Sequence, residues 1–354
     1  AASFQIDSSV AGLGLTAAVE NGGVSKDVAI HIAAERALPS AKYSPAFVCV
    51  HEHVPDSSKE LDQIFKYARW MQDSNLLNQD SGVNAEIERL YRIAAENGHA
   101  KANINLQNGS VQGRYALRGE ESLRLSKKLI DDGVATGYFF IAAYLRGGLS
   151  GLQQDQDAAL VYFRKAADEG SANAQYYLGT RLEPSGAAPE VAMQMYLCAA
   201  EQGNGDAAVA LGVYRRRYGR YEESFHAFQL GVRAGSASAA SFLGHAFRAK
   251  GPEDELFYLG QTEDVERSDR YVRVWRTLAN YSYATPRALE VNDILPPPPA
   301  ILPPWSGKLK WLVEREAEVP PPKPSETQIT EFAKAQMLDP ATGKLIKHRT
   351  HTER

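Results

Sequence analysis

The stretch AADEGSANAQYYLG at residues 166–179 decides the fold, because the chain repeats it in edited form. Related phrases are AAENGHAKANINLQ at 94–107 and AAEQGNGDAAVALG at 199–212. A glycine closes the first half of each phrase, and successive closing glycines are separated by 35, 37, 33 and 32 residues. The chain therefore contains a repeat of about 34 residues. The closing glycines are Gly98, Gly133, Gly170, Gly203 and Gly235.

A second column of small residues stands four positions after the closing glycines, and an aliphatic residue follows each of them four positions later. Residues four apart share one face of a helix, so a neighbouring helix can approach over the small residue and pack on the large one. A closing glycine suits the position just beyond a helix, where the backbone turns left-handed. Each phrase therefore predicts a helix end, a tight turn and a helix start. The pairs are Ala102–Leu106, Gly137–Ile141, Ala174–Leu178, Ala207–Leu211 and Ala239–Leu243.

Two helices per repeat predict an all-α fold, an α-solenoid of about five helical hairpins wound into a right-handed superhelix. We expect the hairpins to occupy residues 84–250. The first helices should begin near residues 101, 135, 172, 205 and 236. The second helices should run over 86–97, 121–132, 155–169, 188–202 and 220–234.

The flanking segments divide into a capping region at 1–83 and a C-terminal helix with a proline-rich arm at 251–354. SSKELDQIFKYARWMQ at 57–72 has helical apolar spacing and a serine cap at Ser57 or Ser58, so it predicts a helix that covers the first repeat. The run AFVCV at 46–50 is strand-like and receives no firm place.

The arm follows a further predicted helix at 266–284 and reads LPPPPAILPPW at 295–305. Six prolines in this stretch exclude a helix and a sheet ladder and favour an extended polyproline conformation. The arm could pack back along the repeats through Ile301, Leu302 and Trp305, which is the favoured interpretation, or it could be presented to a partner. The final KHRTHTER is expected to be frayed.

Composition restricts the function classes. A net charge of −4 and a pI near 6.1 provide no global field for nucleic acid or anionic membrane. No apolar run reaches the roughly 18 to 20 residues that span a bilayer. Cys49 and Cys198 are too few for a disulfide framework and leave the redox compartment open. The first methionine is Met71, so we expect an upstream segment: a cleaved export signal, a lipoprotein anchor or an engineered boundary.

The phrases YLG and DAALVYFRKAADEG resemble Sel-one-like repeats, which are relatives of tetratricopeptide repeats. The resemblance covers about half of the chain and implies a helical scaffold. The sequence departs from the family pattern at 137–151, which lacks the leucine–glycine pair, and at 212–219, where GVYRRRYG forms a short basic connection.

The run CVHEHVP, the C-terminal segment and the repeats together resemble a narrower group. These are bacterial Sel-one-like repeat proteins encoded beside type VI secretion phospholipase effectors, where they serve as immunity proteins. The resemblance implies a periplasmic, non-catalytic binder, lipid-anchored if an anchor segment was removed. Its partner would be a toxic lipid hydrolase of the phospholipase D class.

The sequence gives little evidence for a catalytic or metal-binding site. In CVHEH, the side chains of Cys49, His51 and His53 would share one face of a strand and could begin a zinc site, but the sequence offers no fourth ligand at a usual spacing. The motifs GxSxG, HExxH, HxKxxxxD and a complete phosphate loop do not occur. We therefore expect no enzyme, no metal and no cofactor.

A protein-binding surface is the favoured site. The first helices of tetratricopeptide-like hairpins line a concave face, and the position nine residues after the small column carries arginine in three of four units. Guanidinium groups above aromatic rings suit an acidic partner surface; arginine at a helix end can equally complement the helix dipole in water. The expected partner-binding residues are Phe139, Arg146, Asn173, Tyr176, Asp206, Arg216, Arg217, His245 and Arg248.

Two other functions stay open at this point. An adaptor for envelope or signalling complexes would have several protein partners and would neutralise no toxin. Metal-dependent hydrolysis through residues 49–53 would require bound zinc.

Overall fold

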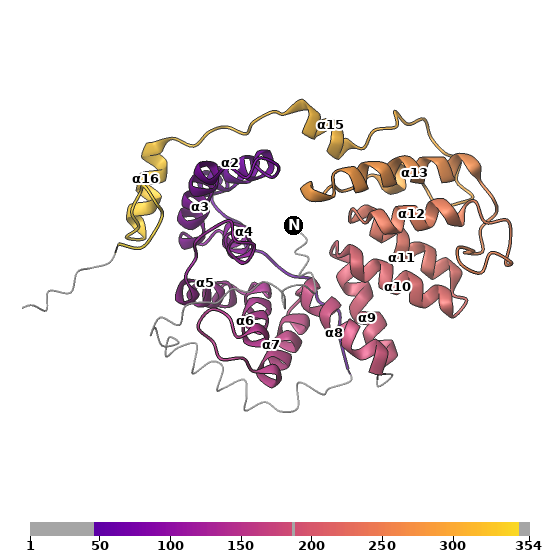
Figure 1. Cartoon of the computed structure of the whole chain (residues 1–354), viewed down its shortest axis with the longest axis horizontal. Helices are drawn as coiled ribbons and strands as arrows, with labels where there is room; N and C mark the ends of the chain where they lie inside the picture. The colour runs from indigo at the N-terminus through magenta and orange to yellow at the C-terminus, as the bar shows by residue number, and fades with distance from the viewer. Residues whose placement is uncertain (1–45, 186–187, 347–354) are drawn as a thin grey trace, which may run out of the picture. The chain divides into compact units, whose positions relative to one another are not determined.

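The computed structural model describes residues 46–185 and 188–346 (Figure 1). Within these ranges it contains fifteen α-helices, one 3-10 helix and no β-strand, with an isolated antiparallel bridge between Leu338 and Leu345. The predicted all-α solenoid of hairpins is confirmed. None of the described helices is long and apolar enough to cross a membrane. The KHRTHTER tail, expected to be frayed, lies outside the described residues.

The helices follow one another in short hairpins. The first part of the chain forms α2 (Lys59–Ser74), α3 (Ser81–Glu96), α4 (Ala100–Val111), α5 (Gly119–Asp131), α6 (Thr136–Gly147), α7 (Gln156–Asp168) and α8 (Ala172–Ser185). The second part forms α9 (Pro189–Glu201), α10 (Gly205–Arg217), α11 (Tyr221–Arg233), α12 (Ala237–Ala246), α13 (Val265–Asn280), η3 (Ser282–Ala284), α14 (Val291–Ile294), α15 (Lys310–Ala317) and α16 (Glu326–Ala335).

The repeat helices begin and end close to the predicted positions, except that α3 begins at Ser81, ahead of the predicted residue 86. The first helices α4, α6, α8, α10 and α12 each start within one residue of the expected position. All five closing glycines have positive φ angles, between 74° and 113°. In four turns the next residue caps the following helix by accepting a backbone N–H with its side chain. These cap residues are His99, Ser171, Asn204 and Ser236.

A glycine inside the first helix lets the next helix pack closely. A Cβ on Gly179 would lie 2.5 Å from the ring of Tyr196, and one on Gly212 would lie 2.8 Å from the ring of Phe228. Gly244 occupies the same repeat position in α12, but its nearest atoms would lie 3.5 Å or more from a Cβ. The glycine of the leucine–glycine pair therefore makes room for an aromatic ring in two repeats. In the third repeat, the space around Gly244 would also accept a methyl group.

The Gly212→Ala and Gly244→Ala variants should change stability in opposite directions. Alanine favours a helix over glycine by about 0.5–1 kcal/mol, so we expect Gly244→Ala to raise the free energy of unfolding by that amount. At Gly212 the methyl group collides with Phe228, and overpacking of this kind costs about 1–3 kcal/mol. Urea denaturation of both variants measures the difference. A Gly212→Ala protein as stable as Gly244→Ala would contradict the close packing.

The described chain forms two compact units. One contains residues 46–52 and Leu160–Val319, and the other contains His53–Ala159 and residues 320–346. The division between the two units falls within α7. The segments 1–83, 84–250 and 251–354 were drawn from the repeat pattern of the sequence, and this division into domains stays a prediction.

The unit that contains α2 to α6 is capped as expected. Helix α2 begins after the Ser58 cap, whose side chain accepts the backbone N–H of Leu61. It packs on α3 and buries Leu61, Ile64 and Phe65. Helix α16, from the C-terminal part of the chain, packs on α3 as well, and Arg89 of α3 binds the carboxylate of Glu326 at 2.7 Å.

The proline-rich arm packs back within the other unit. Leu302 and Trp305 are partly buried against the cluster formed by α11, α12 and α13, as predicted. Ile301 was expected to join them, but this expectation is wrong because its side chain is 91% exposed. Neighbouring side chains of an extended chain point to different sides, so the inward position of Leu302 turns Ile301 outward.

A buried arginine holds the arm. Arg267 of α13 is 3% exposed, and its guanidinium donates to the carbonyls of Pro296 and Ala300 and pairs with Asp264. Gln229 of α11 donates to the carbonyl of Leu295 at 2.9 Å. These side chains satisfy carbonyls that a proline-rich segment cannot pair in a helix or sheet.

Replacing Arg267 by methionine should loosen the arm. The variant keeps much of the side-chain volume but leaves buried carbonyls without donors, so we expect the free energy of unfolding to fall by about 2–3 kcal/mol. Arg276→Met on the exposed side of the same helix is the control and should stay within about 0.5 kcal/mol of the wild type. Urea denaturation followed by tryptophan fluorescence measures both, and equal midpoints would contradict the role of Arg267.

Candidate functional site

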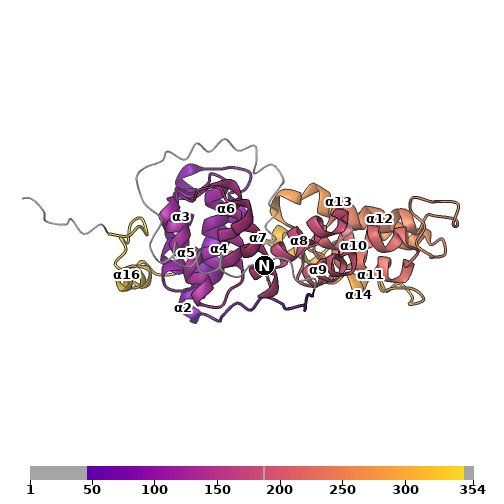
Figure 2. The same ribbon diagram turned by 90° about the horizontal axis from the view of Figure 1, so that it is seen from below.

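The first helices of the hairpins expose one face in the unit that contains α8 to α12. On α10 the side chains of Asp206, Val213 and Arg217 are exposed at separations of seven and four residues, which places them on one face. On α12 the corresponding exposed residues are Ser238 and His245. Helix α10 contacts α12, and the two alternate with α11 in the stack (Figures 1 and 2). We call the exposed side chains of α8, α10 and α12 the first-helix face.

Seven of the nine expected partner-binding residues lie in this unit. Phe139 does not qualify, because it is 2% exposed in the core of the other unit, beside Phe140. Arg146 is half-buried and also belongs to the other unit. The remaining residues are Asn173, Tyr176, Asp206, Arg216, Arg217, His245 and Arg248.

The expected arginine ladder is reduced to the end of α10. Arg248 is exposed but already bound within the chain, because its guanidinium contacts Asp269 at 2.6 Å and donates to Ser268. Arg216 is half-buried and Arg217 is exposed, and neither has an ion-pair partner among the described residues. Of the arginines expected from the sequence in this unit, Arg216 and Arg217 therefore keep their charge for a partner.

Tyrosines of α8 and α9 lie close to carboxylates in the same unit. The hydroxyl of Tyr196 donates to Glu183 at 2.9 Å, and Tyr176 lies 6.0 Å from the Tyr196 ring between centroids. Burial raises the pKa of Tyr196, and the hydrogen bond to Glu183 raises it further. Burial, with Asp206 and Glu183 nearby, raises the pKa of Tyr176 as well. These phenols stay protonated at physiological pH, so they serve as hydrogen-bond donors.

His245 and Tyr218 extend the same face. The imidazole of His245 stacks on Phe257 with centroids 4.5 Å apart and donates from Nδ1 to the carbonyl of Ser241. Tyr218 is 63% exposed and lies 4.8 Å from the ring of Tyr214. Tyrosine and arginine are enriched in the energetically dominant parts of protein interfaces. The face therefore has the composition of a protein-binding surface.

Val213 on α10 was missed among the residues expected from the sequence, although His245, at the same repeat position on α12, was named. Both side chains are exposed and stand six residues after the small column. The signal was present, because position six lies on the side of the helix opposite the buried i, i+4 pair.

A second cluster fastens an extended segment to the helices. Residues 46–52 form no strand, so the strand-like run AFVCV has no sheet partner in the described chain. Instead, Arg164 donates to the Ala46 carbonyl, Gln175 donates to the Val50 carbonyl at 3.0 Å, and Gln202 accepts the N–H of Glu52 at 2.8 Å. We call this segment, residues 46–52, the extended clamp segment.

The clamp segment crosses the turn between α7 and α8. Gly170 stands at this turn with φ of 113°, and a Cβ there would lie 2.6 Å from the backbone nitrogen of Glu52. The closing glycine of this repeat therefore serves two purposes. It permits the left-handed turn, and it leaves room for the crossing chain.

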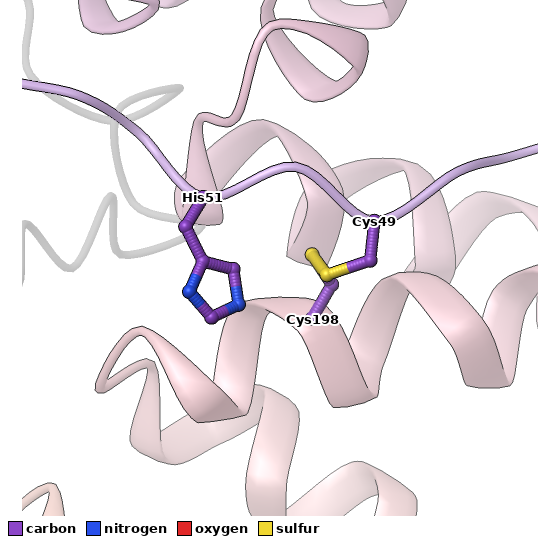
Figure 3. A group of neighbouring side chains, drawn as sticks. All are labelled: Cys49, His51 and Cys198. Atoms are coloured by element: carbon purple, nitrogen blue, oxygen red, sulfur yellow. A yellow bond between two sulfur atoms is a disulfide. The ribbon is translucent and has the colours of Figure 1, made fainter.

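A disulfide joins the clamp segment to α9. Cys49 and Cys198 are bonded, with Cα atoms 5.6 Å apart, across 149 residues of sequence (Figure 3). His51 points to the same side of the segment as Cys49, as the alternation predicted, and its Nε2 lies 3.1 Å from Glu201. His53 does not belong to this cluster. The third member of the cluster is Cys198, which the sequence did not place near Cys49.

Reducing the disulfide should destabilise the protein. Closing a loop of this length restricts the unfolded chain, and such cross-links contribute about 2–5 kcal/mol to the free energy of unfolding. We expect urea denaturation with a phosphine reductant to show this loss, while the Cys49→Ser/Cys198→Ser variant should not respond to the reductant. Peptide mapping without reduction should recover the linked pair. Free thiols at Cys49 and Cys198 in protein that was never exposed to a reductant would contradict the pairing.

Comparison with known proteins places the chain beside bacterial immunity proteins. A family described as a domain of unknown function, DUF6396, matches residues 239–346, from α12 to the end of the described chain. The immunity protein Pa5087 from Pseudomonas aeruginosa is 26% identical, with a TM-score of 0.53 over 72% of this chain and 95% of that one.

Two further Pseudomonas aeruginosa structures show the same likeness. The protein PA5086 is 25% identical, with a TM-score of 0.52 over 72% of this chain and 96% of that one. The immunity protein PA5088 is 24% identical, with a TM-score of 0.53 over 72% and 94%. The expected resemblance to Sel-one-like repeat immunity proteins is therefore confirmed at the level of the fold.

Proposed function

We propose that this protein is an immunity protein that binds and inhibits a toxic effector, and that the effector is a type VI secretion phospholipase of the phospholipase D class. The observation that carries the proposal is the likeness to the immunity protein Pa5087, which extends over 95% of that protein's length. The phospholipase and the secretion system come from the resemblance of the sequence to repeat proteins encoded beside such effectors.

The first-helix face is the proposed contact surface. Arg216 and Arg217 offer guanidinium groups without an acidic partner in the described chain, and Tyr176 and His245 add rings on the neighbouring first helices α8 and α12. A face of this kind suits an effector surface that carries carboxylates, because arginine binds carboxylates with two parallel hydrogen bonds. Asn173 and Asp206 add polar groups at the start of α8 and α10. Arg248 could join only by exchanging Asp269 for a carboxylate of the effector.

Inhibition would act by occlusion and would need no chemistry from this chain. Tyr176 holds its proton because its pKa is raised, so it is a poor nucleophile and a poor base. A tight inhibitor of standard size buries about 1,600 Å² in total, about half of it on each partner. The proposed protein is therefore a binder that covers an active site or blocks its opening.

The disulfide supports a periplasmic location. Disulfides persist in oxidising compartments such as the bacterial periplasm and are rare in the cytosol. A clamp closed by Cys49 and Cys198 fits a protein that meets its effector outside the cytosol. An anchor upstream of the given sequence would hold it at the membrane surface.

Co-expression with a gene-neighbourhood phospholipase tests the proposal. The effector is exported to the periplasm of a bacterial host, and survival, lipase activity and co-purification are measured. We expect survival only when this protein is present, with a 1:1 complex in which lipase activity is lost. Death of well-expressing cells would reject the immunity role and favour the adaptor function, for which a pull-down should then recover several partners.

Charge reversal at the end of α10 tests the contact surface separately. We expect Arg216→Glu/Arg217→Glu to weaken the complex at least about tenfold, since a loss of 1.4 kcal/mol corresponds to that factor. Arg233→Glu, on the exposed side of α11, is the control and should bind like the wild type. Unchanged affinity of the double variant would remove the first-helix face from the proposal while leaving the immunity role intact.

A further inference from the structure

The cluster around the disulfide contains two pairs of metal-binding residues that face each other. Cys49 and His51 are two residues apart on the extended clamp segment, so their side chains share one side (Figure 3). Cys198 and Glu201 are three residues apart on α9 and therefore share one face of the helix. The ligand atoms of Cys49, His51 and Cys198 all lie within 4.8 Å of one another.

Glu201 adjoins this group through its contact with His51. Its Oε2 lies 3.1 Å from Nε2 of His51. Two ligands that each bind zinc at about 2.0–2.1 Å with tetrahedral angles are themselves about 3.3 Å apart. The imidazole and the carboxylate therefore already stand at the separation of two neighbouring zinc ligands. Both side chains are about half exposed, at 53% and 40%, which leaves a path for a metal ion.

The clamp segment is held independently of the disulfide. Gln175 and Gln202 bind its backbone at Val50 and Glu52, and Arg164 binds it at Ala46. These contacts bracket Cys49 and His51 on both sides. Opening the disulfide therefore leaves the two pairs of ligands facing each other, and only the sulfur atoms must move apart.

We propose that the reduced protein binds one zinc-like divalent cation through Cys49, His51, Cys198 and Glu201. A dithiol or phosphine reductant supplies two electrons and is itself oxidised, and the disulfide becomes two thiols by taking up two protons. Metal binding then displaces these protons, so that two thiolates, one imidazole and one carboxylate surround the ion. Thiolate and imidazole ligands in a tetrahedral set select zinc over magnesium or calcium.

The consequence is a clamp with two closed states. In an oxidising compartment the cysteines bond to each other, and in a reducing one the metal bridges the same two elements. Residues 46–52 stay fastened to α9 in both. Neither closed state depends on the identity of the effector.

Cobalt, which takes the place of zinc and absorbs light, is the probe. The full chain is reduced with a phosphine, freed of reductant and titrated with Co²⁺ and then with Zn²⁺. We expect one equivalent of Co²⁺ with a thiolate-to-cobalt charge-transfer band, displacement by Zn²⁺, and a rise in the unfolding temperature of the reduced protein with Zn²⁺. The oxidised chain should show none of these changes.

Neighbouring histidines provide a matched control. We expect His51→Gln and Glu201→Gln to weaken Co²⁺ binding by about ten- to a hundredfold, whereas His53→Gln in the same HEH run should bind like the wild type. Circular dichroism checks that each variant is folded. No charge-transfer band in the reduced chain would overturn the proposal. Equal affinity of His51→Gln, Glu201→Gln and the wild type would overturn it too, because the thiolates alone would then bind the ion.

Discussion

The fold depends on one backbone constraint, the positive φ angle of the glycine that closes each second helix. The chain leaves one helix in a left-handed turn, and in four of the five turns the next residue already caps the following helix. A turn this short allows only antiparallel neighbours, so the helices that it joins pack against each other, as α3 does on α4 and α11 on α12. Alanines and glycines at the contact then let the helices approach, and larger side chains fill the space beside them.

Segments that are not helical are held by side chains that satisfy their backbone. Arg267 and Gln229 bind carbonyls of the proline-rich arm, and Arg164, Gln175 and Gln202 bind the backbone of residues 46–52. In both places long polar side chains of the repeat helices take the role that a neighbouring strand would play in a sheet. The repeats thus support two segments that could not fold by themselves.

The repeats fix a scaffold, and the proposed function depends on the side chains that the scaffold leaves exposed. Intramolecular pairing decides which of them are available. Arg248 is neutralised by Asp269, whereas Arg216 and Arg217 have no carboxylate partner among the described residues. Arginines at equivalent positions of the repeats therefore differ in the charge that they can offer to a partner.

The sequence by itself determined the all-α class, the repeat period and the helix boundaries to within one or two residues at most positions. This was possible because glycine turns, caps and i, i+4 pairs are local signals that recur in register. It also indicated that the arm packs back, since Leu302 and Trp305 are large and apolar.

Only the tertiary structure decided which distant residues meet. The bond between Cys49 and Cys198, the burial of Phe139 and the pairing of Arg248 depend on surfaces that come together after the helices have formed. Such contacts leave no periodic pattern, because each involves one residue on each side. A single sequence therefore records the scaffold, which is repeated, and not the individual contacts that fasten it and shape its surface.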